Sequence, residues 1–458
     1  MKPSYEELEN MLVRTQELLK KALEEIAKLK EQINLNSKNS SKAPSTDQKS
    51  NTKDKEKKKR GSREGKSRAL FSSDRIDRHV QCTQENCPHC GSSCIQISNQ
   101  APEVLQQAEL PEVKATVTEY QLFKYRCEEC GKKSTAHLPK GIPDSAFGPK
   151  LMGLIATLTG VFHLAKREAV QLIEELYEVD IGVGSIPNIE ERVAKALDPI
   201  YQRIHKFIIE SQFCKYFDET GWRDRGKKHF VWLASCEQAA FYQIDRRRSS
   251  EAFERLVKKN PKGFAAVTDR YAVYNVIGKK HQYCLAHLIR DFEKYAERAG
   301  SDKEIGKGLV EELKMTCHTH GEYRKEKITL EERNKKLRVC KKRVKIWFEE
   351  GMANGSDPLY KLSEKLLDNF DKLWTFMKVK GMEPTNNLAE RDLRKLVIWR
   401  RKSYGTRSDR GQRFVERITT VAQTVKKQGK NILSTIQEAV GKFYAKSSPE
   451  EIYQALKV

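Results

Sequence analysis

One segment of the sequence cannot form a folded domain, and it divides the chain. From Asn34 to about Leu70 the residues are mostly Ser, Asn, Lys, Asp and Gln, with almost no apolar side chains, and the segment ends in a Lys/Arg run. Such a composition cannot bury enough apolar surface to offset the conformational entropy lost on folding. We therefore expect a disordered basic linker over residues 34–72, which serves as a solubilising tether, as a non-specific contact to phosphates, or as both.

Before this linker, apolar side chains recur at alternating spacings of three and four residues. The repeat consists of Tyr5, Leu8, Leu12, Thr15, Leu19, Ala22, Ile26, Leu29 and Ile33. With Glu, Lys and Gln on the remaining faces, this a/d pattern predicts a short parallel coiled coil over residues 1–33, and therefore a homo-oligomer. The alternative is a single amphipathic helix that docks on its own chain.

Length and charge limit the remaining possibilities. At 458 residues the chain is too long for one compact domain, and 38% hydrophobic residues suffice for real cores. The formal net charge of +23 favours a polyanionic partner, because each cation placed on a phosphate releases counterions. A membrane is the competing partner. The N-terminus has no signal-peptide core, however, and the longest apolar stretch, Leu151 to Ala165, is interrupted by His163 and too short to span one, so we expect a cytoplasmic protein without a membrane partner.

Two CxxCG motifs predict a zinc site. The chain has eleven cysteines, and in a reducing compartment clustered cysteines bind metal or pack in a core more often than they pair. The candidate ligands are Cys87, Cys90, Cys127 and Cys130. Because the sequence between the motifs alternates like a β-strand, it describes a zinc ribbon over residues 80–140, with a structural Zn²⁺ held by four thiolates. Buried free thiols are the alternative, and the lower-ranked ligand candidates are Cys82, His89 and Cys94.

Residues 147–205 have the pattern of helices. Leu151 to Thr159 is apolar, Leu164 to Glu178 is amphipathic, and a glycine-containing turn follows. Ser185 can then cap a short helix over residues 186–197. Two helices joined by such a turn suit a helix-turn-helix that reads the major groove of DNA. A helical hairpin that binds nothing is the alternative.

From Phe213 onward the sequence becomes rich in β-strand patterns. The expected strands are CKYFDET, HFVWLASC and AAFYQIDR, then the run ending at Thr268, and HQYCLAHL from His281; an amphipathic helix from Ser249 to Lys259 separates the first three from the others. This order predicts an α/β arrangement around one mixed sheet. A long charged helical stretch follows, from Arg290 to about Lys380.

Two aspartates in this region follow apolar runs. Asp218 comes after Tyr216 and Phe217 in the first strand, and Asp269 directly follows the apolar run that ends at Thr268. A carboxylate on a hydrophobic strand costs desolvation energy unless a metal ion or another cation compensates for it. For either aspartate alone, a loop cap is the simpler interpretation. Two of them on sheet elements of a basic protein point to a functional site.

A third acid, Glu390, lies beyond the charged helical stretch. Thr385 or Asn386 can cap a helix in which Asn386, Glu390 and Arg394 fall on one face. A lone glutamate in a basic helix is usually a surface ion pair. Here, however, basic neighbours can bind the phosphates of a nucleic acid, and the candidates are Arg391, Arg394, Arg401 and Lys402.

Together these motifs resemble transposases of the insertion sequence 66 family over nearly the whole chain. The matching segments are the N-terminal repeat, the linker, the paired CxxC motifs, DETGW at Asp218 to Trp222, TDRYAVYN at Thr268 to Asn275, CLAHLIRDF at Cys284 to Phe292, and NNLAERDLR at Asn386 to Arg394. The resemblance implies a ribonuclease H-like core with a DDE triad of Asp218, Asp269 and Glu390. It also implies that Cys284 and His287 belong to an inter-strand motif of this core rather than to a zinc site.

The implied chemistry needs two Mg²⁺ (or Mn²⁺) ions. Such a pair can activate a water or a 3′-hydroxyl and stabilise the leaving oxygen of an in-line displacement, and Mg²⁺ prefers hard oxygen ligands. Asp218 would bridge the two ions, and Asp269 and Glu390 would each complete one site. The nearby basic side chains, named above as DNA-binding candidates, would position the phosphates.

We therefore expect a multidomain α/β protein that acts as a DNA transposase. The expected domains after the ribbon are the helix-turn-helix region 147–205, the catalytic domain 211–425 with a helical insertion at about 295–380, and a C-terminal helical segment 426–458. The partners would be double-stranded DNA with terminal inverted repeats, target DNA, further copies of the chain and small companion proteins. The protein would be associated with the nucleoid in a bacterial cytoplasm. The alternatives are a non-catalytic DNA-binding regulator and a metal-dependent structure-specific nuclease.

Overall fold

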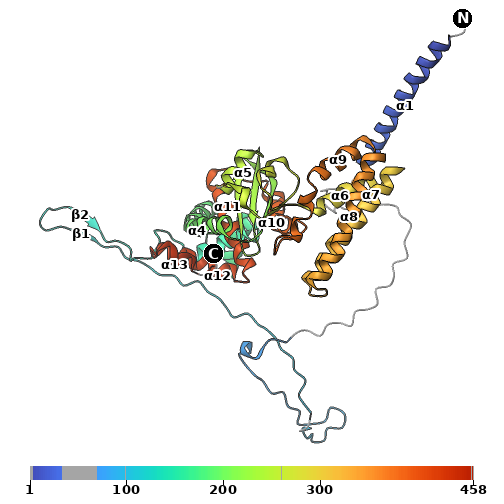
Figure 1. Ribbon diagram of the computed structural model, residues 1–458. Helices are drawn as coiled ribbons and strands as arrows, with labels where there is room; N and C mark the ends of the chain where they lie inside the picture. The colour runs from blue at the N-terminus through green and yellow to red at the C-terminus, as the bar shows by residue number, and fades with distance from the viewer. Residues whose placement is uncertain (1–3, 34–69, 98–99, 259, 455, 457–458) are drawn as a thin grey trace. The chain divides into compact units, whose positions relative to one another are not determined.

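The computed structural model describes residues 4–33, 70–97, 100–258, 260–454 and 456 (Figure 1). These residues fall into two units, one within residues 48–115 and the other formed by the rest of the described chain, and each is treated by itself. The basic linker predicted over residues 34–72 lies almost entirely outside the described residues. In the described part of the chain, no helix is long and apolar enough to cross a membrane.

The N-terminal repeat forms one helix, α1 (Tyr5–Ile33). The Ser4 hydroxyl accepts a hydrogen bond from the Glu7 backbone N–H at 3.2 Å, and the Glu7 carboxylate accepts one from the Ser4 N–H at 2.8 Å. This reciprocal pair satisfies two N–H groups that the first helical turn leaves without partners. Apolar side chains of the repeat are about half exposed, among them Leu8 and Leu12. The helix itself is confirmed, whereas its pairing as a coiled coil stays a prediction.

A five-stranded mixed sheet forms the centre of the larger unit, with the strand order β5-β4-β3-β6-β7. The strands are β3 (Lys215–Asp224), β4 (Lys227–Ser235), β5 (Ala240–Asp245), β6 (Ala266–Thr268) and β7 (His281–Tyr283). The first three pair antiparallel as a meander, and β3, β6 and β7 pair in parallel. The predicted mixed α/β sheet is therefore confirmed.

The last predicted strand is shorter than expected. HQYCLAHL was predicted as one strand, but β7 ends at Tyr283 and α6 (Leu285–Ala296) begins two residues later. Leu285, Leu288 and Phe292 are buried with the helical spacings of three and four residues. A short apolar run does not distinguish a strand from a buried helix, which explains the error.

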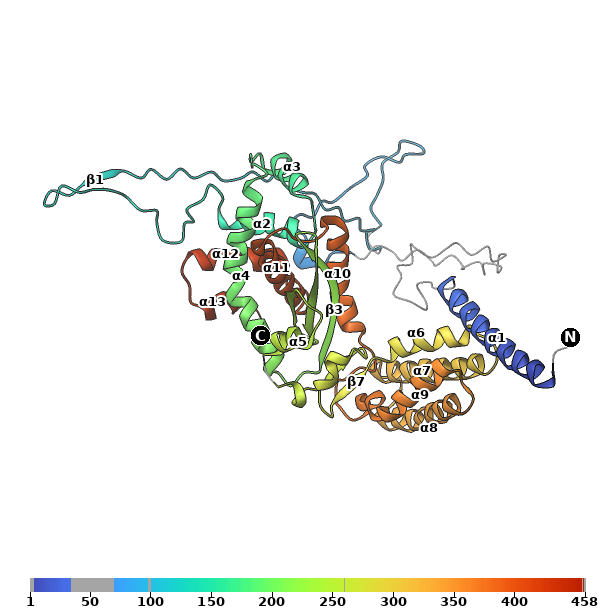
Figure 2. The same cartoon turned by 90° about the horizontal axis from the view of Figure 1, so that it is seen from above.

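Helices cover the sheet and its outer edge. They are α2 (Pro149–Gly160), α3 (Lys166–Tyr177), α4 (Ser185–Glu210), α5 (Ser250–Val257), α10 (Asn387–Ser403), α11 (Asp409–Lys427), α12 (Ile432–Tyr444) and α13 (Pro449–Tyr453). The contacts place α10 against β3 and β4, and α11 against β5 and α4. Figure 2 shows α10 running beside β3.

Side chains of α11 accept hydrogen bonds from the backbone N–H groups along the free edge of strand β5. Backbone N–H groups of Ala240 and Tyr242 each donate to a threonine hydroxyl of α11 at 3.1 Å, and that of Ile244 donates to the Glu416 carboxylate at 2.6 Å. The acceptors, Thr424, Thr420 and Glu416, are four residues apart on one helix face, and the donors are two residues apart along the strand. An uncovered edge strand would offer these donors to another chain.

The helix-turn-helix prediction is only partly matched by the described helices. α3 and α4 are joined by the glycine-containing turn, and α4 begins at Ser185. The second helix was predicted to end at Leu197, but α4 continues to Glu210 and buries thirteen of its residues. Pro199, which lies inside α4, does not stop it. Groove recognition by this segment stays a prediction.

The interval between the second and third predicted acids contains a helical bundle. Its helices after α6 are α7 (Ser301–Arg324), α8 (Leu330–Asn354) and α9 (Asp357–Asp368), followed by two 3₁₀ turns, Phe370–Leu373 and Thr375–Met377. Buried side chains such as Leu309, Leu337 and Phe348 form its interior. At the α8 N-terminus Thr329 and Glu332 form a capping box, which marks a helix start that the sequence encodes locally.

Candidate active site

Sheet register places Asp218 and Asp269 side by side. Strands β3 and β6 pair in parallel, with Tyr216 opposite Val267. Asp218, within β3, and Asp269, just after the end of β6, each lie two residues beyond this pair and therefore on the same side of the sheet. Neighbouring strands are about 4.8 Å apart. The structure therefore brings two of the three predicted acids together through backbone pairing alone.

The environment of Asp218 disfavours its negative charge. Burial raises the pKa of Asp218 well above its ordinary value, and the charges of Glu219, Asp269 and Glu390 raise it further. The backbone N–H of Glu219 donates to one oxygen of Asp218 at 2.9 Å, which partly opposes this effect. A buried carboxylate beside other acids is stable as an anion only when a cation neutralises it. A bound cation would therefore stabilise the ionised form of Asp218.

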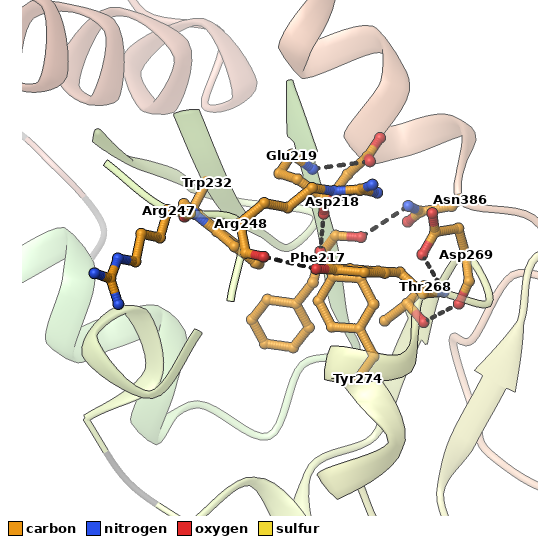
Figure 3. Close-up of polar contacts among 11 residues, drawn as sticks. Phe217, Asp218, Glu219, Trp232, Arg247, Arg248, Thr268, Asp269, Tyr274 and Asn386 are labelled. Carbon is orange, nitrogen blue, oxygen red and sulfur yellow. Dashed lines mark hydrogen bonds and ion pairs between the residues drawn. The ribbon is translucent and has the colours of Figure 1, made fainter. Parts of the chain in front are cut away.

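Glu219 is a fourth acid that the sequence reasoning did not single out, although it is the second residue of DETGW. Its side chain is only 2% exposed. The Arg248 guanidinium donates to one carboxylate oxygen at 2.7 Å, and the Tyr274 hydroxyl donates to the other (Figure 3). Burial raises the pKa of Glu219, and the charge of Asp269 adds to this effect. The only available sequence signal was its position next to Asp218.

The same network holds the loop that carries Asp269. The backbone N–H of Tyr271 donates to the Asp269 carboxylate at 2.9 Å, and the Tyr271 hydroxyl donates to the carbonyl of Arg248 at 2.7 Å. The guanidinium of Arg248 lies 3.9 Å from the centre of the Tyr271 ring, in a cation–π contact. The Phe253 ring packs edge to face with Phe217 and with Tyr274. The Asp269 loop is thus fixed to β3 by side-chain contacts from two directions.

Glu390 lies in the first turn of α10, and its helix is attached to β3 by Asn386. The Asn386 side chain donates to the Phe217 carbonyl at 2.9 Å, immediately before Asp218 (Figure 3). Asn386 was predicted as a helix cap, and it does occupy that position, but its side chain accepts no capping hydrogen bond. It instead joins the helix to the strand that carries the first acid.

The Glu390 carboxylate contacts α6, and its charge also contributes to the raised pKa of Asp218. One oxygen accepts a hydrogen bond from the Arg290 guanidinium at 2.7 Å and lies 3.7 Å from Nδ1 of His287. The sequence reasoning placed Arg394 beside Glu390, but Arg394 is exposed and the neighbouring guanidinium comes from α6. In the described chain, the ligand atoms that lie within 4.8 Å of one another belong to Cys284, His287 and Glu390, not to the three predicted acids.

The predicted DNA-binding residues lie along the outward face of α10. Arg391, Arg394, Arg401 and Lys402 are all exposed. Their neighbour Arg400 is instead directed inward and donates to the Gly221 carbonyl, which ties the end of α10 to β3. The exposed set is available to a polyanion, but no described contact tests its role.

Both cysteine motifs form the same type of turn. In the first, the Gly91 N–H donates to the Cys87 carbonyl at 2.8 Å, and in the second the Gly131 N–H donates to the Cys127 carbonyl at 2.9 Å. Both glycines have positive φ, of 77° and 68°, which a side chain would strain. Hydrogen bonds lower the pKa of Cys90, chiefly from Ser92, and that of Cys127, chiefly from Cys130. Each turn thus suits a pair of metal-binding thiolates.

The segment between the motifs differs from the prediction. Among its described residues, only β1 (Lys124–Arg126) forms a strand, and it pairs antiparallel with β2 (Lys133–Thr135), which follows the second motif. Residues 113–123 alternate in sequence but are exposed and have no regular structure. Alternation alone gives a strand no stability when no second surface covers its apolar face. The two motifs belong to different units.

The residues at the candidate active site fit a hard divalent cation. Asp218 and Asp269 offer carboxylate oxygens, the ligands that Mg²⁺ prefers. The carbonyl oxygen of the Asn386 side chain is buried and has no hydrogen-bond partner in the described chain. An unpartnered buried acceptor beside two acids is consistent with a site made for a cation or its bound water.

Comparison with known protein families agrees with this geometry. Residues 144–413 match the model described as "Transposase IS66 family", and residues 84–131 match the "zinc-finger binding domain of transposase IS66". Residues 2–69 match a family of unknown function. None of the curated proteins compared with the chain matched it. Because the first match spans more than half of the chain and includes all three predicted acids, the protein belongs to the IS66 family of transposases.

Proposed function

We propose that the protein binds the terminal inverted repeats of an insertion element and catalyses metal-dependent cleavage and transfer of its DNA strands. The observation that carries the proposal is the parallel pairing of β3 with β6. Asp218 in β3 and Asp269 just after β6 each lie two residues beyond the paired Tyr216 and Val267, and Glu390 lies on a helix attached to β3. This arrangement is what a ribonuclease H-like core with a DDE triad would require. Family membership supports the same conclusion.

Each residue of the candidate active site has a defined part in this proposal. When bound, a pair of divalent metal ions would polarise the scissile phosphate and lower the pKa of the attacking water or 3′-hydroxyl. Asp218 would contact both ions, and Asp269 and Glu390 would each hold one. Arg248 and Tyr274 keep Glu219 in place, so that its charge adds to the negative potential of the site. The exposed cations of α10 would then hold phosphates of the DNA beside these acids.

The remaining parts of the chain supply DNA binding and assembly in the same proposal. Cys87, Cys90, Cys127 and Cys130 would hold one structural Zn²⁺, and residues 147–205 would contact the terminal repeats. The exposed apolar stripe of α1 would pair two copies, which places two catalytic domains on two DNA ends. Small companion proteins and a cytoplasmic, nucleoid-associated location are part of the same proposal, and family membership is their only support.

The decisive experiment compares Asp218→Asn with the wild-type chain on DNA that carries terminal repeats. We expect the variant to bind the repeats as tightly as the wild type and to lose Mg²⁺-dependent cleavage. Unchanged cleavage would rule out the proposed site. A regulator would bind without cleaving in either form, so a wild-type chain that binds and never cleaves would favour that alternative.

A second measurement separates a transposase from a nuclease. Precleaved ends with free 3′-hydroxyls are incubated with wild-type protein and circular target DNA. A transposase joins the ends to the target, whereas a nuclease only hydrolyses DNA. Joined products that depend on Asp218 would establish strand transfer. Hydrolysis without joining would favour the nuclease.

A further inference from the structure

One face of α6 contacts the beginning of α10 at three points. Cys284 is the N-cap of α6, and His287 and Arg290 follow it at intervals of three residues. The Cys284 sulfur accepts a hydrogen bond from the Asn386 backbone N–H at 3.1 Å. His287 and Arg290 approach one oxygen of Glu390, at 3.7 Å and 2.7 Å. The motif CLAHLIRDF thus meets the motif that carries the third acid.

These contacts leave little room for a separate metal site at the same place. The ligand atoms of Cys284, His287 and Glu390 lie within 4.8 Å of one another, which is a spacing that a metal ion could use. The Cys284 sulfur is already a hydrogen-bond acceptor, however, and burial raises the pKa of Cys284 to about 11. The Arg290 cation also occupies the Glu390 oxygen that such an ion would need. The cluster is better explained as a support for Glu390.

Glu390 needs such support more than the aspartates do. Its carboxylate is joined to the backbone by three rotatable bonds and is 37% exposed. Asn386 fixes where α10 starts but does not fix the direction of the Glu390 side chain. Ligands are held in productive geometry when neighbouring side chains restrict their rotamers. On α6, the Arg290 guanidinium donates to the Glu390 carboxylate, and the His287 ring lies beside the same oxygen without a hydrogen bond, so both restrict this side chain.

We propose that Cys284, His287 and Arg290 are positioning residues for Glu390. Cys284 sets the start of α10 through Asn386, and His287 and Arg290 set the direction of the Glu390 carboxylate. The three residues thereby couple the end of β7, where α6 begins, to the acid that follows the helical bundle. This inference rests on the proposed function, because it assigns α6 a role only if Glu390 is the third metal-binding acid.

The test uses the full-length chain and variants of α6. Arg290→Ala removes the donor to Glu390, His287→Ala removes the neighbouring ring, and Arg290→Lys keeps one charged donor. Lys294→Ala is the matched control, because Lys294 lies one turn further along α6 and contacts Asp291 instead of Glu390. Two readouts are taken: kcat and KM for cleavage of terminal-repeat DNA, and backbone scission by Fe²⁺-generated hydroxyl radicals, which maps the metal-binding segments without requiring activity.

We expect Arg290→Ala to lower kcat by about 10- to 100-fold with little change in KM, because contacts of this kind act on the metal ligand and not on DNA. Arg290→Lys should recover part of the loss, since lysine offers a single point charge in place of the guanidinium fork. Fe²⁺-directed scission near residue 390 should weaken, and scission near residues 218 and 269 should persist. Lys294→Ala should resemble the wild type in both readouts.

Several outcomes would overturn the inference without affecting the proposed function. Arg290→Ala and His287→Ala could both retain the wild-type kcat and scission pattern, or KM alone could rise, which would assign Arg290 to DNA contact. A cobalt–thiolate absorption band that Cys284→Ser removes would instead assign the cluster to a metal site. If the wild-type chain shows neither cleavage nor scission near any of the three acids, the proposed function itself fails.

Discussion

The candidate active site has two halves that are held by different means. Asp218 and Asp269 are placed by strand register, which depends on backbone hydrogen bonds between β3 and β6. Glu390 is placed by side chains, namely Asn386 at the start of α10, which bonds to β3, and Arg290 on α6. The strand half therefore depends on the sheet as a whole, whereas single substitutions can disturb the helix half.

This difference has a consequence for how the site assembles. The two aspartates are neighbours as soon as the sheet forms, because a parallel register leaves no other arrangement for them. Glu390 joins them only when α10 is seated against β3 and its side chain is directed correctly. The positions of Asp218 and Asp269 in the strand half should thus be unaffected by changes in α6 and α10. The position of Glu390 in the helix half should respond to changes in both.

The largest effect that we expect in the strand half comes from Asp269→Asn. This change keeps the shape of the side chain, including the acceptor for the Tyr271 N–H, but removes the charge that a divalent ion requires. Cleavage of terminal-repeat DNA should fall by about a thousandfold or more, as is usual when one member of a catalytic unit is removed. The measurement is single-turnover cleavage in Mg²⁺.

The matched control for this prediction is Glu293→Gln. Glu293 is an acid on α6 that contacts Lys314, away from the two aspartates. The control should cleave DNA at the wild-type rate. If Asp269→Asn cleaves as fast as this control, Asp269 has no catalytic role. The strand half would then not be part of an active site.

The two halves also differ in how far the sequence could predict them. The strands that carry Asp218 and Asp269 were predicted because each is a short apolar run that ends in an acid, and this pattern is local. The partners of Glu390 were not, because Arg290 is far away in sequence and reaches Glu390 only after the helical bundle folds. Arg394 was chosen in its place from helical spacing, which predicts a shared face but no contact between neighbours on that face.

Burial explains the other differences between sequence and structure. Residues 113–123 alternate like a strand, but no second surface covers them, and they remain irregular and exposed. α4 was predicted to end at Leu197, but its packing against α11 and α2 extends it to Glu210. Glu219 was overlooked because its importance comes from Arg248 and Tyr274, which no local pattern connects to it.

The second prediction concerns the anchor of α10 on the sheet. The Lys427 ammonium group of α11 lies 2.8 Å from the Asp392 carboxylate, which also accepts a hydrogen bond from the Ser235 hydroxyl at 2.6 Å. Both ionic side chains are largely buried, at 10% and 11% exposed. Lys427→Ala leaves the Asp392 charge unpaired and should destabilise the fold by about 3 kcal/mol. The thermal unfolding midpoint, followed by tryptophan fluorescence, measures the loss.

A double variant distinguishes charge from packing at this anchor. Asp392→Leu combined with Lys427→Met replaces the pair by apolar side chains of similar size, and such replacements are often close to neutral. We expect the double variant to unfold at a higher temperature than Lys427→Ala. A double variant no more stable than the single one would mean that the hydrogen bonds of Asp392, not its charge, hold α10 in place.

The third prediction is a pH effect at the edge strand β5, where α11 covers the sheet. Burial raises the pKa of Glu416, which accepts the Ile244 N–H of edge strand β5, from 4.5 to about 7. Because the folded state binds the proton more tightly than the unfolded state, its stabilisation is present below pH 4.5 and is lost as the pH rises to about 7. We expect a loss of about 1–3 kcal/mol across this window.

Glu416→Gln isolates this effect from other titrating groups. Glutamine keeps an acceptor for Ile244 but cannot ionise, so the variant should lose less stability than the wild type between pH 5 and 8. The difference between their unfolding midpoints should therefore grow with pH. A constant difference would show that Glu416 does not titrate in this range, and that the edge of β5 is held equally well by a charged carboxylate.

The smallest expected effect tests the outer face of the helix half. Arg394 and Lys402 are exposed on α10, and each should contribute one phosphate contact if DNA lies along this face. Replacing either by alanine should weaken binding uniformly across DNA sequences and lower the slope of log affinity against log salt by about one. Lys361→Ala on α9, which is also exposed, is the control. Because these cations only hold the DNA, cleavage at saturating DNA should be unchanged. A loss of cleavage at saturation would instead mean that α10 has to be correctly seated by DNA before Glu390 can join the two strand acids.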